Sequence, residues 1–411
     1  MATARTCLVT SACGACVALA GALAMQPRLN PAYAEEQPPR AAASAPPRVP
    51  AIDAALQALL DQHEAAGLVA LVAQNGTVIH QSAIGSANLE ESRPMTADAM
   101  FWIASMTKPM TASAVMILEE EGRLSIDDPV SKHIPSFANL KLSDGSPVKE
   151  TLLIRHLLTH TSGLSGLERP PGPETRTLEE QANLMAQAPL AFEPGSKWAY
   201  GSSLEVAGRI VEVASGQPFD EFLAERVFRP LDMREATFVL SDEQAARLAT
   251  TYRVNESRDG LTPGRNRYVS NVPGIRQTPM PSGGLFATVR DVQRFYQMLL
   301  NDGELEGVRI LQPETVARMT SLQTGELPTG FTPGNGWGLG VCIVRAPQGV
   351  SEALSPGSFG HGGAHGTQVW CDPERHALYV LMLQRADLPN SDNSEFRRLL
   401  QNEGLRALDA Q

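Results

Sequence analysis

The chain has 411 residues, 43% of them hydrophobic and 19% charged, which is enough to bury a large core in one domain or in two closely packed ones. The formal net charge is −11 and no Lys- or Arg-rich stretch stands out, so no nucleic-acid partner is expected. Thirty prolines and 34 glycines predict many turns and long loops between the regular elements.

The N-terminus has the features of a secretory signal peptide covering residues 1–34. Arg5 supplies a positive charge, residues 7–25 form an apolar stretch, and Ala32-Tyr33-Ala34 is an A-x-A cleavage site. An uncleaved membrane anchor is the alternative. Residues 35–50 are rich in Pro, Ala and Ser and are predicted to form a disordered linker. We expect a periplasmic or secreted protein, with no stable membrane insertion once the signal is cleaved near Ala34.

Two cysteines, Cys342 and Cys371, remain after the predicted signal peptide is removed. Both fall in predicted strands. One disulfide is conceivable in an oxidising compartment, but two separate buried thiols are the favoured interpretation. Nothing about their surroundings in the sequence indicates a metal site or a catalytic thiol.

The remaining chain begins with a helix and a hairpin. Residues 52–66 have amphipathic helical spacing, whereas residues 68–74 and 77–84 are apolar runs typical of strands. Asn75-Gly76, between those two runs, is typical of a two-residue hairpin turn.

The middle of the chain has mostly helical patterns, and its end returns to strands. The predicted helices are residues 152–158, 178–188, 204–214, 219–228 and 289–300, the last with Thr288 and Asp291 as a capping box. The predicted C-terminal strands are residues 336–345, 367–371 and 377–384, followed by a helix at residues 394–408.

These elements predict an α/β fold of the α+β type in one domain, residues 51–411. The N-terminal hairpin and the C-terminal strands would share an antiparallel sheet of five or more strands, flanked by the first and last helices. Residues 51–104 and 280–411 would form this sheet lobe, and residues 105–279 an inserted, mostly helical lobe. A cleft is expected at the seam, lined or covered by loops at residues 165–177 and 255–279.

Ser105-Met106-Thr107-Lys108 places a hydroxyl and an amine three residues apart at the predicted start of a helix. Positions i and i+3 share a helix face, so Lys108 can lie against the Ser105 oxygen. Residues 110–118 continue the helix to a stop at Gly122. A desolvated lysine can help remove the proton of a serine nucleophile, and a helix N-terminus favours developing negative charge. A chance S-x-x-K on a surface helix is the alternative.

A second candidate residue is Tyr200, on the loop that enters the predicted helix 204–214. A lysine beside the phenol would favour its charged form, which would let Tyr200 pass a proton between serine and leaving group. An ordinary half-buried tyrosine is the structural alternative.

A third segment, residues 360–366, reads Gly-His-Gly-Gly-Ala-His-Gly and leads into the predicted strand 367–371, after a predicted loop at residues 356–360. So many glycines beside a strand indicate close backbone approach to a ligand. An exposed N–H there could form an oxyanion hole with the N–H of Ser105. A β-bulge is one alternative. A metal pair at His361 and His365 is another, but no third ligand has clear spacing, so no metal is expected.

In order and spacing these segments resemble the serine β-lactamase and penicillin-binding-protein superfamily, on its class C side, which includes D,D-peptidases and family VIII carboxylesterases. The family pattern of S-x-x-K, Y-x-N or Y-x-S, and K-T-G or H-x-G is matched by Ser105–Lys108, Tyr200–Ser202 and His361–Gly363. Residues 154–164 and 281–287 are similar to family segments as well. The resemblance covers about residues 52–408.

This resemblance implies that Ser105 is the acylated nucleophile and that Lys108 and Tyr200 exchange its proton, with either of them as the general base. It also implies that the N–H groups of Ser105 and Ala364 hold the oxyanion, and that His361 takes the place of the family's lysine. Water activated by the Lys108/Tyr200 pair would hydrolyse the acyl-enzyme, and no cofactor is implied.

Several positions depart from the family pattern. Ser202 stands where β-lactamases usually carry an asparagine, and His361 and Gly362 replace Lys and Thr of K-T-G. These changes weaken the expected carboxylate clamp and favour neutral ester substrates. The expected substrate-binding residues are His361, Gly362, Gly363 and Ser202. His156 and His160 are interpreted as structural.

The leading hypothesis is therefore a serine hydrolase that cleaves small carboxylic esters. The alternatives with the same first half-reaction are a D,D-carboxypeptidase, a D-aminopeptidase or a weak β-lactamase acting on cell-wall-like peptides, and an acyltransferase. A catalytically inactive binding protein is the non-enzymatic alternative. The expected partner is a small ester or peptide, and the sequence leaves the acyl group, the leaving group and the oligomeric state open.

Overall fold

The computed structural model describes residues 46–164, 176–264 and 278–410, within a compact unit that spans Ala45–Gln411. The predicted signal peptide, most of the predicted linker and most of the two loops predicted at the cleft lie outside the described residues. Among the helices that are described, none combines the length and apolar character needed to cross a membrane.

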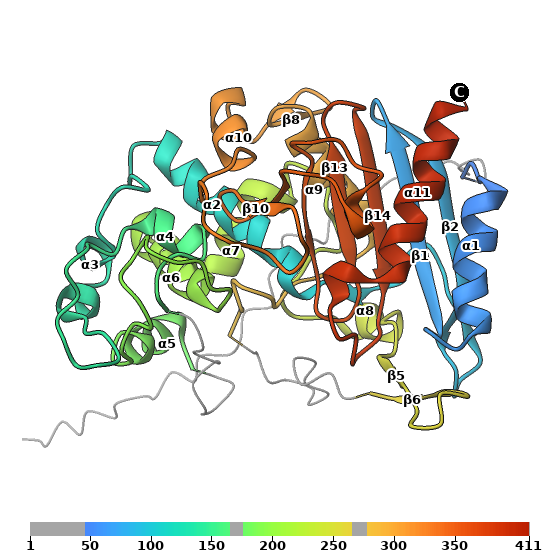
Figure 1. The fold of residues 1–411 in the computed structure, drawn as a ribbon, viewed down its shortest axis with the longest axis horizontal. Coiled ribbons are helices and arrows are strands. Elements are labelled where there is room, and N and C mark those ends of the chain that lie inside the picture. Colours follow the sequence, from blue (N-terminus) through green and yellow to red (C-terminus); the bar gives the residue numbers. More distant parts are fainter. Residues whose placement is uncertain (1–45, 165–175, 265–277, 411) are drawn as a thin grey trace, which may run out of the picture. The chain divides into compact units, whose positions relative to one another are not determined.

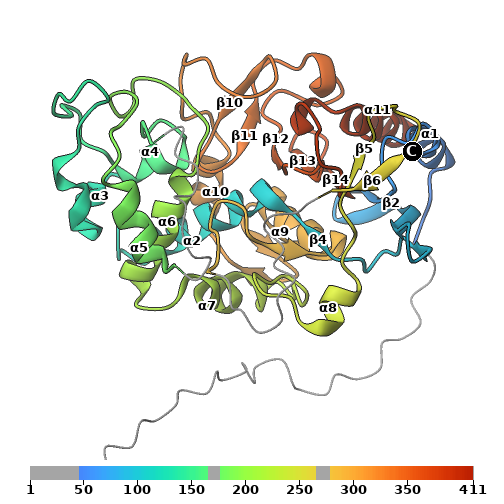
Figure 2. The same cartoon turned by 90° about the horizontal axis from the view of Figure 1, so that it is seen from below.

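An eight-stranded antiparallel sheet forms the centre of this unit (Figure 1 and Figure 2). The strand order is β10-β11-β12-β13-β14-β1-β2-β3, so the N-terminal hairpin completes a sheet made otherwise by the end of the chain. The predicted fold class is therefore confirmed. The strands are β1 (Gly67–Gln74), β2 (Thr77–Asn88), β3 (Arg93–Pro94), β10 (Asn335–Trp337), β11 (Cys342–Val344), β12 (Phe359–Gly362), β13 (Gln368–Asp372) and β14 (Ala377–Leu383).

Strand β1 joins the two ends of the chain, because it pairs with β2 on one side and with β14 on the other. Its alternating side chains enter two different apolar layers. Val69 belongs to the layer of helix α9 (Val289–Leu300). Leu68 belongs to the layer of helices α1 (Pro50–Asp61) and α11 (Glu395–Asp409), which lie side by side in Figure 1. Helices thus cover both faces, which explains why β1 is apolar from Gly67 to Ala73.

The predicted hairpin turn is confirmed, since Asn75 and Gly76 both have positive φ, 51° and 76°. The first helix differs from prediction at both ends. It starts at Pro50 and ends at Asp61, followed by His63 with φ 58°, so the expected continuation to residue 66 is wrong. The end of the predicted linker is ordered as well, because Pro47 accepts a hydrogen bond from the Gln81 N–H at 2.9 Å.

Two strand predictions need correction. The predicted strand 336–345 is divided into β10 and β11, because the chain turns at Gly340, which has φ 77°. The predicted loop at residues 356–360 runs into strand β12, which was missed because it is rich in glycine. At Gly360 a Cβ atom would lie 2.1 Å from the Val369 carbonyl oxygen, so only glycine fits this close pairing.

The helical predictions are confirmed with shifts of a few residues at their ends. The π-helical turn Ala224–Phe228 completes the predicted helix 219–228. The helices of this region are α2 (Lys108–Glu120), α3 (Val130–His133), α4 (Ile154–Leu158), α5 (Leu178–Met185), α6 (Ser203–Ser215), α7 (Phe219–Leu223), α8 (Asp242–Ala246) and α10 (Pro313–Met319). Short strand pairs are β4 (Phe101–Trp102) with β7 (Phe286–Ala287), β5 (Tyr252–Val254) with β6 (Leu261–Pro263), and β8 (Glu304–Leu305) with β9 (Val308–Arg309).

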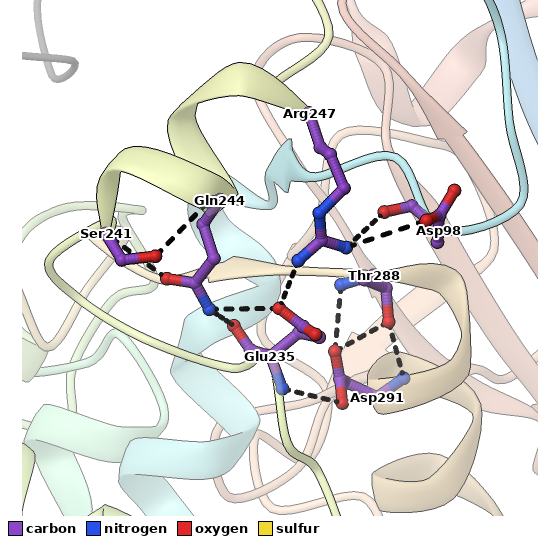
Figure 3. Close-up of polar contacts among 7 residues, drawn as sticks. All are labelled: Asp98, Glu235, Ser241, Gln244, Arg247, Thr288 and Asp291. Carbon is purple, nitrogen blue, oxygen red and sulfur yellow. Dashed lines mark hydrogen bonds and ion pairs between the residues drawn. The ribbon is translucent and has the colours of Figure 1, made fainter. Parts of the chain in front are cut away.

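A polar network ties the start of α9 to the chain ahead of Ser105 (Figure 3). The predicted capping box is present, since Thr288 and Asp291 exchange backbone and side-chain hydrogen bonds. The second Asp291 oxygen accepts the Glu235 N–H at 3.4 Å. The Glu235 carboxylate binds Arg247 at 2.6 Å, and Arg247 also donates to the Asp98 carbonyl at 2.8 Å.

Helix α8 takes part in the same network. Gln244 donates from its side-chain amide to the Glu235 carboxylate at 3.1 Å, and Ser241 caps this helix at its N-terminus (Figure 3). Because β7 immediately precedes α9 and pairs with β4, the network fixes the strand that leads to Ser105. Of this polar network, the sequence analysis predicted only the capping box formed by Thr288 and Asp291.

Thr288→Ala is expected to reduce the free energy of unfolding by about 1 kcal/mol, because it removes the N-cap acceptor of α9. Urea denaturation followed by circular dichroism measures this change. Thr96→Ala is a matched control, because Thr96 is exposed and lies just ahead of β4. Equal unfolding midpoints for the two variants would contradict the capping role.

Candidate active site

Ser105 lies in a 3₁₀ turn, Ala104–Thr107, between β4 and α2. Ala104, directly before it, has φ 47°, a left-handed conformation that costs energy for a residue with a Cβ atom. Two bonds hold it there: the Thr107 hydroxyl donates to the Ala104 carbonyl at 2.7 Å, and the Leu285 N–H donates to the Thr107 oxygen at 3.2 Å. The strained backbone therefore has tertiary support from the β7 side.

Lys108 is the first residue of α2, and only 3% of it is exposed. Its Nζ donates to the Ser105 Oγ at 3.0 Å and to the Ser282 carbonyl at 2.7 Å. The expected contact between Lys108 and Ser105 is present, but a 3₁₀ turn produces it, because residues i and i+3 eclipse in that geometry.

Burial lowers the pKa of Lys108 to about 7, because the charged ammonium loses its hydration. The carboxyl groups of Glu205 and Asp392 act in the opposite direction, since negative charge favours the ammonium. Lys108 can therefore hold or release a proton near neutral pH.

Tyr200 lies just before α6 and faces the same lysine. The Lys108 Nζ is 4.6 Å from the centre of the Tyr200 ring, and a side-chain hydrogen bond joins Tyr200 to Ser105. Burial raises the pKa of the Tyr200 phenol, and the bond to Ser105 only partly opposes this. The expectation that Lys108 would favour a charged phenolate is thus wrong, because burial favours the neutral phenol and dominates its pKa. The structure brings the three side chains together with Tyr200 in its neutral form.

The glycine-rich segment packs directly against the chain ahead of Ser105. A Cβ atom on Gly363 would lie 2.5 Å from the Ile103 carbonyl oxygen and 2.1 Å from the Thr367 Oγ1. Gly363 is therefore needed for close approach of the two segments. Ala364 is the next residue and is exposed, in the turn between β12 and β13.

His361 and Gly362 are residues of strand β12, which the sequence did not predict. The buried His361 ring donates its Nδ1 proton to the Gly362 carbonyl at 2.7 Å. Burial and the nearby Lys108 lower the pKa of His361 to about 3, so its ring is neutral. On the other side of this strand, a Cβ atom on Gly362 would meet the Asp392 carboxylate at 1.9 Å.

Three further residues from the sequence analysis, Ser202, His156 and His160, lie at different distances from this centre. Ser202 is the residue before α6, and its side chain makes no capping bond. The His156 Nδ1 accepts the Leu153 N–H at 3.2 Å, a loop bond of the expected structural kind. His160 is buried with its ring centre 4.4 Å from that of Tyr200, so its packing bears directly on the candidate site.

The structure also bears on the predictions for the two cysteines and for metal ligands. Cys342 and Cys371 are separate buried thiols, as favoured from the sequence. Within the described ranges, no group of three or more His, Cys, Asp or Glu side chains is placed to hold a metal ion.

Sequence reasoning missed three residues that act on Lys108: Glu205, Asp392 and Ser282. Glu205 is 3% exposed, and its carboxylate accepts the N–H of Ser282 at 3.2 Å and also the Ser282 hydroxyl. A signal was available, because Glu205 interrupts the apolar run Leu204-Glu205-Val206-Ala207 on a predicted helix face. Ser282 lies in the family-like segment 281–287, but the residue type alone gave no role for its carbonyl.

Comparison with known proteins identifies relatives and structural neighbours of this chain. Protein Rv1367c of Mycobacterium tuberculosis (strain ATCC 25618 / H37Rv) is 31% identical over 80% of this chain and 88% of its own length. Esterase EstB of Burkholderia gladioli is 34% identical over 81% of this chain and 89% of its own length. The solved structure of EstCE1, a hydrolase with promiscuous acyltransferase activity, has 27% identity and a TM-score of 0.75, covering 87% of this chain and 97% of that one.

Residues 52–402 match the β-lactamase protein family, and the chain belongs to that family. It is a serine hydrolase of the serine β-lactamase and penicillin-binding-protein superfamily.

The labelling rate of Ser105 by a fluorophosphonate probe is expected to rise with pH through a midpoint near 7. The Lys108 amine must be neutral to accept the serine proton, and it loses its own proton as the pH passes its pKa of about 7. Rates measured over a series of buffers test this. Lys108→Arg is the control, since a guanidinium stays protonated and should slow labelling by roughly 10²-fold or more. A wild-type rate independent of pH would contradict the assignment.

Proposed function

We propose that the protein hydrolyses small, uncharged carboxylic esters through an acyl-enzyme on Ser105. The observation that carries this proposal is the 3.0 Å hydrogen bond between the Lys108 Nζ and the Ser105 Oγ, with the lysine pKa held near neutrality. A buried amine near its pKa can take the hydroxyl proton and later return it to a leaving group.

In the first half-reaction the Ser105 oxygen attacks the ester carbonyl carbon while its proton passes to Lys108, directly or through Tyr200. The N–H groups of Ser105 and Ala364 stabilise the oxyanion of the tetrahedral intermediate. Its collapse breaks the bond to the alkoxy leaving group, which receives the proton and departs as an alcohol. The acyl group remains bound to Ser105.

In the second half-reaction water attacks the acyl carbon and gives its proton to the Lys108/Tyr200 pair. Ser105 then leaves with a proton, and the carboxylic acid is released. Burial lowers the pKa of Lys108 and raises that of Tyr200, so near neutral pH the amine is available unprotonated as the base while the phenol stays protonated and can relay a proton.

The charges along strand β12 support an uncharged substrate. Where relatives in the superfamily carry a lysine, His361 is neutral, and the Asp392 carboxyl group lies against Gly362. A substrate carboxylate would gain no cation from His361, and the acidic group of Asp392 behind the strand adds no favourable charge. The similarity to esterase EstB points in the same direction.

Aromatic side chains beside Tyr200 support an apolar acyl or alcohol group. Phe331 is 42% exposed, and its ring centre lies 4.8 Å from that of Tyr200 and 6.0 Å from that of Trp198. An exposed ring next to Tyr200, which is hydrogen-bonded to the candidate nucleophile, offers apolar contact to a substrate.

A second candidate function is acyl transfer to an added alcohol or amine. It is favoured by the similarity to EstCE1, a hydrolase with promiscuous acyltransferase activity, and it uses the same acyl-enzyme. Partitioning of product toward an added alcohol, measured by chromatography, distinguishes transfer from hydrolysis.

Ser105→Ala is expected to reduce the release of p-nitrophenol from a short-chain ester by about 10³-fold or more, because the nucleophile is lost. Ser136→Ala is the control, since Ser136 is exposed and bonds only to Asn183 among the described residues. Unchanged hydrolysis by Ser105→Ala would refute the proposed function. Stable labelling of Ser105 by a fluorescent penicillin, without ester turnover, would favour the D,D-peptidase alternative instead.

Wild-type protein is expected to prefer p-nitrophenyl butyrate over the similar but anionic p-nitrophenyl hemisuccinate by about tenfold in kcat/KM. Asp392→Asn should narrow this ratio several-fold, because it removes the acidic group beside Gly362. Glu395→Gln is the matched control, since Glu395 is exposed and paired with Arg398 at the start of α11. A preference for the hemisuccinate would exclude selection for uncharged esters.

A further inference from the structure

The buried carboxylate of Glu205 is connected to Lys108 through a single residue. Glu205 lies in the first turn of α6 and accepts hydrogen bonds from both the N–H and the hydroxyl of Ser282. The carbonyl of that same Ser282 accepts the Lys108 Nζ at 2.7 Å. The carboxylate therefore acts on the loop that holds the amine of the candidate site.

This loop is clamped between helices α2 and α6. The Thr111 hydroxyl of α2 donates to the Pro281 carbonyl at 2.6 Å. On α6, a Cβ atom at Gly208 would lie 2.1 Å from the Pro281 ring, so the glycine lets the loop approach closely. With the chain already held at Pro281, the bonds from Ser282 to Glu205 determine the direction of the Ser282 carbonyl.

Glu205 is also one of several groups whose charge affects Lys108. Two carboxyl groups, Glu205 and Asp392, favour the ammonium form, and Glu205 has the larger effect. The other titratable groups around the amine are His160, His361 and Tyr200. Burial disfavours charge on all three, and it also raises the pKa of Asp392, whose negative charge the nearby Arg397 counterbalances. Glu205 is therefore the main negative charge that offsets the desolvation of Lys108.

We propose that Glu205 is a positioning residue for the reaction: it aims the Ser282 carbonyl at Lys108 and places a negative charge one residue away from this amine. An amine with too little proton affinity would be a weak base, and one with too much would stay protonated. The inference rests on the proposed function, because it assigns Glu205 through Lys108 and not through contact with substrate.

Glu205→Gln tests the charge while it keeps a side-chain oxygen for the Ser282 donors. The readout is the rate of fluorophosphonate labelling of Ser105 against pH. Loss of the negative charge should move the acid limb of this profile to lower pH by about half to one unit. Glu205→Asp keeps the charge on a shorter side chain, so its acid limb should stay near the wild-type position while its maximal rate falls several-fold.

Two further variants complete the experiment. Glu212→Gln is the control, because Glu212 lies on the same helix and pairs with Arg209 away from Lys108. Ser282→Ala removes only the hydroxyl donor to Glu205 and should move the limb in the same direction by a smaller amount. It provides the same test if Glu205→Gln does not give the wild-type circular dichroism spectrum.

The outcomes separate this inference from the proposed function. Wild-type protein whose Ser105 is not labelled at any pH would refute both. Wild-type labelling with an acid limb that stays in place in Glu205→Gln, or that does not move in Ser282→Ala, would refute only the role of Glu205. An equal shift in Glu212→Gln would show a general effect of charge and also overturn it.

Discussion

The candidate site depends on one buried amine. Removing the Lys108 ammonium from water is unfavourable, and the protein compensates with the Ser282 carbonyl, the Ser105 oxygen and nearby carboxylates. The compensation is partial, so the pKa falls to about 7 and not further. This balance is what makes Lys108 able to exchange a proton with a neighbouring hydroxyl.

The candidate site forms only where segments far apart in the chain meet. The antiparallel sheet places β12 beside β13 and β11, and the turn after β12 presses Gly363 against Ile103. The β4–β7 pair and the bonds of Thr107 hold Ala104 in a left-handed conformation directly before Ser105. Strain at this position is therefore maintained by the surrounding strands, as expected where backbone geometry serves a site.

Family membership defines the fold and the class of chemistry, while substrate preference depends on side chains at the edge of the sheet. His361 and Gly362 occupy the strand positions where a K-T-G motif would carry a cation and a hydroxyl. Since His361 is neutral and Asp392 lies behind Gly362, the local charge differs from that of a carboxylate-binding edge. Side chains at this edge can therefore alter substrate preference while the fold stays the same.

The sequence by itself determined those features that depend on local pattern. The Asn75-Gly76 turn, the helix 289–300 with its Thr288/Asp291 cap, and the i to i+3 relation of Ser105 and Lys108 all follow from short-range geometry. The order of the three motifs was enough to identify the superfamily and to predict a shared antiparallel sheet.

Only the tertiary structure decided what depends on close packing and burial. Strand β12 was missed because its glycines lower strand propensity, although the adjacent strand leaves room for nothing larger. The charge state of Tyr200 was predicted in the wrong direction, since desolvation cannot be read from neighbouring residues in the sequence. The link from Glu205 through Ser282 to Lys108 was invisible for the same reason: 77 residues separate Glu205 from Ser282, and only the packing of α6 against the loop brings them together.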